Sequence, residues 1–208
     1  MKVAGLYMTL CRLYGIETPL EIEHFLVMAM EPSPCVLVGN SDISREALII
    51  RQNGDDIEMG LYLDPAIVCA LEGGEELDNL DALSCAAEGV SHFLYVADRA
   101  GKGMKVSKLE LELQGEVDKF LLIHLIAASR FDSVPREFFE RQFESHSFDP
   151  SLGADEAARY RAASHFAAKF CAHLRSTCFN PLRRSDLVAR AREFFSLRLS
   201  GKIAMLTP

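Results

Sequence analysis

Leu109-Glu-Leu-Glu-Leu-Gln-Gly-Glu116 is the stretch whose structure decides the fold. Its leucines alternate with polar residues, as in a half-buried strand, but its apolar stripe continues at helical spacing through Val117 and Phe120. Because the helical pattern extends over residues 107–128, much longer than an ordinary strand, we predict a helix there. Beside the stripe runs a polar ridge of Glu110, Gln114 and Asp118.

The preceding segment, residues 75–99, shows the same ambiguity between helix and strand. Between residues 75 and 99 apolar side chains recur at helical spacing, which predicts a long helix. Gly89 interrupts the pattern, and glycine costs about 1 kcal/mol relative to alanine inside a helix. A helix that stops at Gly89 and continues as a strand over 90–96 is therefore an open alternative. The choice between helix and strand stays open for 90–97 and for 107–113.

Two helices joined around Lys102 would bring polar side chains to matched heights. His92 and Glu112 each lie ten positions from Lys102, and Glu88 and Glu116 each lie fourteen away. Carboxylates and imidazoles from facing helices are typical ligands of divalent iron, manganese or zinc. The sequence therefore predicts a metal site at Glu88, His92, Glu112 and Glu116. The alternative is a set of surface carboxylates and a core histidine with a hydrogen-bond partner.

Other chemically active residues form no recognisable constellation. His124 lies in an apolar stripe two turns beyond Glu116, which indicates a core residue whose polar atoms have hydrogen-bond partners. His165 and His173 are eight residues apart and cannot meet on one ion in a straight helix. The sequence contains no P-loop, GxGxxG, GxSxG or HExxH motif. We therefore identify neither a catalytic residue nor a cofactor-binding motif, and whether the protein is an enzyme stays open.

The sequence of the N-terminal part, residues 1–65, predicts helices and a small antiparallel sheet. Helical spacing favours helices at 3–14 and, more briefly, at 19–30, before two prolines. The turn residues 53–56 join two apolar segments in the strongest hairpin signal of the chain. The predicted strands, which form a meander, are 35–38, 46–51 and 57–63.

The sequence of residues 66–208 predicts a helical bundle. We expect this bundle to pack with residues 1–65 as one compact unit. Asp64 and Pro65 start a short helix that reaches Leu71. Further helices are predicted at 135–143 and 155–176, and a last one is capped by Ser185 and ends at Gly201. The expected fold class is α+β, with the small sheet near the N-terminus and a mainly helical remainder.

Composition limits the classes of function. The 208 residues are 49% hydrophobic and carry a formal net charge of −8, which is unfavourable for binding nucleic acid or an anionic membrane. Acids dominate residues 55–88 and bases dominate 175–202. The basic segment can pair with the acidic one or with an acidic partner, or both segments can be solvated. The chain shows neither a convincing signal peptide nor a membrane-spanning segment. Its six cysteines without a CxxC motif suit buried thiols in a reducing cytoplasm, where we place the protein.

An N-terminal helix followed by a three-stranded meander in an acidic protein resembles secretion chaperones and other adaptor proteins that hold a segment of a partner. The resemblance covers less than a third of the chain and rests on element order and acidity. It implies a binding or adaptor function with another protein as partner. The alternative is a metal-dependent enzyme that uses the central helical hairpin, with the four predicted ligands as its site.

Overall fold

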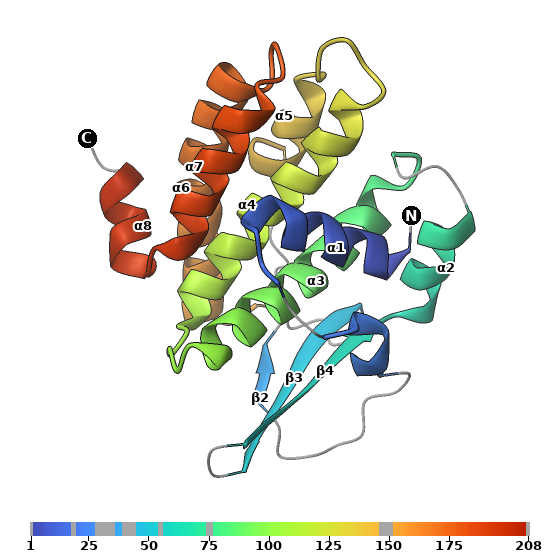
Figure 1. Cartoon of the computed structure of the whole chain (residues 1–208), viewed down its shortest axis with the longest axis vertical. Coiled ribbons are helices and arrows are strands. Elements are labelled where there is room, and N and C mark those ends of the chain that lie inside the picture. Colours follow the sequence, from blue (N-terminus) through green and yellow to red (C-terminus); the bar gives the residue numbers. More distant parts are fainter. Residues whose placement is uncertain are drawn as a thin grey trace.

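The computed structural model describes residues 2–17, 20–27, 36–38, 45–53, 56–73, 77–145 and 152–206. Within them a helical bundle packs against a small sheet, which confirms the α+β class. Figure 1 shows the sheet at one end of the molecule and the C-terminal helices at the other.

The predicted hairpin is present. Strands β3 (Glu46–Asn53) and β4 (Asp56–Leu63) pair antiparallel, in register from Glu46 with Leu63 to Asn53 with Asp56. Strand β2 (Val36–Val38) pairs antiparallel with β3 and completes the predicted meander, although Cys35, with which we began that strand, lies outside the described residues. Leu48 and Leu61, on the same face of the hairpin, are buried in the core.

The helix predicted at 19–30 is wrong over its described residues. A short 3-10 turn (Ile22–Phe25) is followed by strand β1 (Leu26–Val27), which pairs parallel with β4 and makes the sheet mixed, in the order β1-β4-β3-β2. The ring of Phe25 lies 5.0 Å from that of Phe93. Tertiary packing and the hydrogen-bonding groups of β4 thus outweigh a weak helical pattern.

Both central segments are helices, which settles the open alternatives. Helix α3 (Leu80–Gly101) runs through Gly89 without a break, and α4 (Lys108–Ala128) includes the alternating leucines. A Cβ at Gly89 would lie 3.0 Å from Leu61 and 3.3 Å from Leu63. Glycine is therefore present because the sheet approaches the helix backbone there, and the packing compensates its low helical propensity.

The remaining helices surround this hairpin. Helix α1 (Val3–Tyr14) is as predicted, ends at Gly15 with φ 65°, and packs on α3 and α4, while α2 (Pro65–Gly73) covers another side of α3. Helices α5 (Glu137–Phe143) and α6 (Ala154–Cys178) pack on α4. The buried α4 therefore lies at the centre of the bundle, as Figure 1 shows.

The single last helix predicted from Ser185 to Gly201 is wrong. The chain forms α7 (Arg184–Ser196), turns at Leu197 with ψ 149°, and continues as α8 (Leu199–Leu206). Ser185 lies inside α7 and does not cap it. The turn lets α8 bring the Lys202 side chain, which is 0% exposed, into contact with the bundle interior. The break therefore accompanies the burial of Lys202, whose Nζ donates to Gln114 Oε1.

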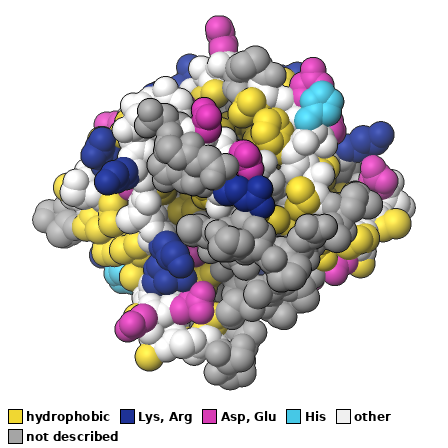
Figure 2. Space-filling view, turned by 90° about the horizontal axis from the view of Figure 1, so that it is seen from below, with side chains coloured by type: hydrophobic (Ala, Val, Ile, Leu, Met, Phe, Trp, Pro, Cys, Tyr) yellow, Lys and Arg dark blue, Asp and Glu magenta, His cyan; other side chains and the backbone are white. Residues whose placement is uncertain are grey.

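The described surface has no simple charge pattern on the face seen in Figure 2, where acidic, basic and hydrophobic side chains alternate. Among the described helices, none combines the length and apolar character needed to cross a membrane. The cysteines are only partly as expected. Cys11, Cys171 and Cys178 are buried, whereas Cys69 is exposed.

Candidate metal centre

The helical hairpin brings three of the four predicted ligands together. Glu88, His92 and Glu112 each offer one donor atom, and these atoms all lie within 4.8 Å of one another. His92 Nε2 and Glu112 Oε2, the pair expected at equal height, are 3.9 Å apart, too far for a hydrogen bond. The equal distances from Lys102 therefore predicted the relative height of the two helices correctly.

His92 is the unusual member of this group. Its side chain is 0% exposed, and neither ring nitrogen has a hydrogen-bond partner among the described residues. Buried polar atoms are nearly always paired, so such a ring calls for an explanation. A Cβ at Gly115 would lie 3.0 Å from His92 Nε2 and 3.7 Å from Glu88 Cγ. Glycine at 115 therefore gives the imidazole and the Glu88 side chain room between the helices.

The fourth predicted ligand, Glu116, is engaged elsewhere. Lys119 Nζ donates to Glu116 Oε1 at 2.6 Å and to Glu88 Oε2 at 3.0 Å. Gln142 Nε2 donates to the other carboxylate oxygen of Glu116 at 3.0 Å. Sequence reasoning missed Lys119, although its position three residues after Glu116 was a signal for an ion pair on one helix.

The electrostatic setting follows from burial and from two cations, Lys119 and Arg159, the second of which has its Nε 3.8 Å from Glu112 Oε1. Burial lowers the pKa of His92 to about 4, so its ring is neutral near pH 7 and keeps a lone pair. Burial, followed by the charge of Glu88, raises the pKa of Glu112 to about 8. Burial also acts to raise the pKa of Glu88, but Lys119 and His92 outweigh it and lower this pKa overall.

Chemically, the arrangement can hold a cation. One neutral imidazole and two carboxylates match the donor preferences of zinc, manganese and iron(II). No match to this chain was found among family models, curated proteins or solved structures. What the group can bind is therefore judged from its own residues.

A second buried polar cluster lies beside the hairpin, around Asp118. Its carboxylate accepts hydrogen bonds from the Tyr14 hydroxyl, from Ser91 Oγ at 2.5 Å and from Gln114 Nε2 at 2.9 Å. Lys202 Nζ donates to Gln114 Oε1 from helix α8. Burial raises the pKa of Asp118 to about 6.

The Asp118 cluster connects four helices, and most of its members are fully paired with one another. Four members of the cluster are fully buried, namely Ser91, Gln114, Asp118 and Lys202. Groups that are all satisfied and closed to solvent are typical of a structural network. We therefore assign this cluster to stability. The polar ridge noted in the sequence is thus a buried one, which the spacing alone did not reveal.

The effect of Gly115→Ala tests the role of that glycine. Alanine favours the helix by about 1 kcal/mol, but its methyl group would push against His92 Nε2. We expect affinity for zinc to fall at least about tenfold with little change in the stability of the metal-free protein. Calorimetric titration measures the affinity. Gly101→Ala is the matched control because a Cβ there meets nothing within 4 Å; equal affinities in the two variants would contradict this role.

His124 is a core residue, as predicted, but only its Nδ1 has a hydrogen-bond partner among the described residues, and its Nε2 has none. Its Nδ1 lies 3.0 Å from the carbonyl oxygen of Phe120, and its ring lies 3.7 Å from the Phe120 ring. Burial lowers its pKa to about 3, opposed by the hydrogen bond to Phe120 and assisted by Arg175. The other two histidines considered from the sequence, His165 and His173, are both exposed.

His124 makes stability sensitive to acid. Since the unfolded chain takes up this proton near pH 6.5 and the folded chain does not, folding stability is full above pH 6.5 and falls below it. Between pH 6.5 and pH 4.5 the protonation of His124 in the unfolded chain should lower folding stability by about 2 kcal/mol. We measure the free energy of unfolding by denaturant at pH 6.5 and at pH 4.5. The decrease between the two pH values should be smaller in His124→Phe by the contribution of His124. The control His173→Phe should show the same decrease in unfolding free energy as the wild type. An equal decrease in all three proteins would refute the role of His124 in acid sensitivity.

Proposed function

We propose that this protein binds one divalent transition-metal ion between α3 and α4, with Glu88, His92 and Glu112 as ligands. The observation that supports this most is the buried His92 ring, whose nitrogens lack hydrogen-bond partners in the described part of the chain, beside two carboxylates. A metal ion would use the lone pair of one nitrogen, would compensate the charge of Glu88, and would displace the proton that Glu112, with a pKa of about 8, carries near pH 7.

The geometry requires only modest adjustment. Donor atoms around a tetrahedral zinc ion, each about 2.1 Å from it, lie about 3.4 Å apart. The present separations of up to 4.8 Å would close by rotations of the two glutamate side chains. Lys119 would then keep Glu116 as its partner while Glu88 turns toward the ion.

Three protein ligands leave at least one coordination position for water or a substrate. Catalytic zinc sites use three protein ligands and a water, whereas structural zinc sites use four protein ligands. This favours the metal-dependent enzyme over a purely structural metal site.

Thermal unfolding of the metal-stripped full chain tests the proposal. At a free zinc concentration of about 100 times the dissociation constant, binding stabilises the folded state by about 2.7 kcal/mol. For a chain of this size that raises Tm by about 5–10 °C. Manganese and iron(II) should act similarly, and magnesium, which prefers all-oxygen ligands, much less. No rise in Tm with zinc, manganese or iron(II) would contradict the proposal.

The adaptor function inferred from the N-terminal helix and sheet stays a prediction. Co-purification of one specific protein with both the wild type and a His92 variant would support it. Such a partner would be compatible with a metal site, since the sheet and the hairpin interior are different parts of the fold.

A further inference from the structure

A cavity of about 230 Å³ adjoins the candidate metal centre, between α3, α4 and α5. Lys119 and Glu116 line its inner side, and Lys119 is hydrogen-bonded to Glu88, one of the three candidate ligands. Lys119 therefore connects the cavity to the candidate metal group, because its side chain lines the cavity and donates to Glu88. Its volume suits a ligand smaller than a typical drug molecule.

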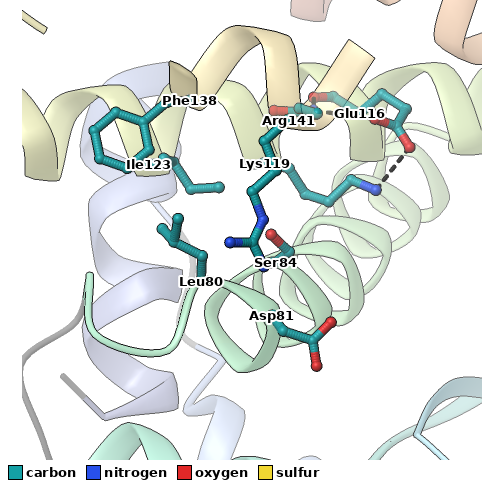
Figure 3. A pocket seen from close by; sticks show the side chains of 9 residues that line it. Leu80, Asp81, Ser84, Glu116, Lys119, Ile123, Phe138 and Arg141 are labelled. Atoms are coloured by element: carbon teal, nitrogen blue, oxygen red, sulfur yellow. Dashed lines mark hydrogen bonds and ion pairs between the residues drawn. The ribbon is translucent and has the colours of Figure 1, made fainter. Parts of the chain in front are cut away.

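The lining divides into an apolar and a polar side. Figure 3 shows Leu80, Ile123 and Phe138 on one side of the cavity, with Arg141 reaching across from α5 toward Ser84. A ligand that fills this space would place a short hydrocarbon part against the apolar side and a hydrogen-bonding group against the polar side.

Arg141 is the side chain best placed to receive a negatively charged group. Among the described residues its guanidinium makes neither a hydrogen bond nor an ion pair, although, after the hydrogen bond from Arg45, its charge helps to lower the pKa of Asp81. The nearby acid, Asp81, is already paired with Arg45, whose Nη1 donates to it at 3.2 Å. A guanidinium has several donors in a fork that matches a carboxylate.

Charge balance links this cavity to the metal. Arg45 and Asp81 neutralise each other, and the charges of Lys119 and Arg141 balance those of Glu88 and Glu116. A divalent cation at Glu88 would leave the whole group positive. It would also compete with Lys119 for Glu88 and so free a hydrogen-bond donor on the cavity wall.

From these contacts we infer that the cavity binds a short aliphatic carboxylate, with its carboxylate on Arg141 and its hydrocarbon part on Leu80, Ile123 and Phe138, more tightly when the metal is bound. This inference rests on the proposed metal function and names the ligand class of the same site. Because linkage is reciprocal, the carboxylate should tighten metal binding by the same factor.

Three titrations of the full chain test the inference. Zinc is first titrated into the metal-free protein, and butyrate is then titrated into the zinc-loaded and the metal-free protein by ligand-observed NMR. We expect zinc to tighten butyrate binding at least about fivefold. Acetate should bind more weakly than butyrate because it lacks the hydrocarbon part, and butylammonium should not bind. Inorganic phosphate that binds more tightly than butyrate would overturn the assignment to a carboxylate.

The variant Arg141→Met should weaken butyrate binding at least about tenfold and change zinc affinity less than twofold. Arg161→Met, an exposed arginine on α6 outside the cavity, is the matched control and should change neither. Butyrate binding that is independent of zinc or of Arg141, with normal zinc binding, would overturn this inference alone. Failure of zinc to bind in the first titration would overturn the proposed function itself.

Discussion

The variant His92→Phe should be as stable as the wild type or more stable without metal, and its Tm should no longer respond to zinc. Phenylalanine fills the space of the imidazole with a ring of similar shape, so no large cavity forms. It also removes two buried nitrogens that have no hydrogen-bond partner in the described structure. Replacing unpaired buried polar atoms by apolar ones is neutral or stabilising, and here we expect a gain of about 1–2 kcal/mol.

The loss of the metal response should be complete, because imidazole is the only nitrogen ligand in the group. The wild-type rise of about 5–10 °C would disappear, whereas His124→Phe, which removes a buried histidine outside the group, should keep it. Thermal melts with and without zinc at pH 7.5 measure both effects. A His92→Phe variant that is strongly destabilised and still responds to zinc would show that His92 is a paired core residue and no ligand.

The variant Asp118→Ala should cause the largest loss of stability among these changes. Three buried donors on Tyr14, Ser91 and Gln114 would lose their acceptor, and Lys202 would lose an opposite charge. Breaking such a buried ionic network by removing one partner costs about 3–5 kcal/mol. We expect Tm to fall by about 10 °C or more.

Two comparison variants separate the network from general effects of substitution. Asp118→Asn keeps one acceptor oxygen and the shape of the side chain, so we expect a smaller loss, about 1–2 kcal/mol. Glu58→Ala removes an acid from the exposed ion pair with Arg51 and should change stability by less than about 0.5 kcal/mol. Denaturant unfolding of the metal-free proteins gives the values. An Asp118→Ala protein within 1 kcal/mol of the wild type would contradict a structural role for the cluster.

The parts of the fold predicted correctly are those determined by local periodicity. Helices α1, α3 and α4 and the hairpin of β3 and β4 follow from residue spacing and turn residues, because long regular patterns leave few alternatives. The height of His92 opposite Glu112 followed from counting residues on both sides of Lys102, because two antiparallel helices rise equally from their connection.

The parts that failed depend on partners far away in the sequence. The break at Leu197 is coupled to the burial of Lys202 against Gln114, which is 88 residues away. Strand β1 exists because β4 offers it hydrogen bonds. The rotation of α4 points Glu116 toward Gln142 of α5 and leaves three residues in the metal group. Spacing gives the height of a side chain along a helix, but only packing gives its direction.

Equilibrium dialysis of the metal-stripped full chain against zinc, followed by measurement of bound metal per chain, tests the proposed metal centre most directly. We expect one zinc ion per chain in the wild type and in His124→Phe, and loss of this ion in His92→Phe and in Glu112→Gln. No bound zinc in the wild type, or an equal amount in all four proteins, would contradict a metal centre at Glu88, His92 and Glu112.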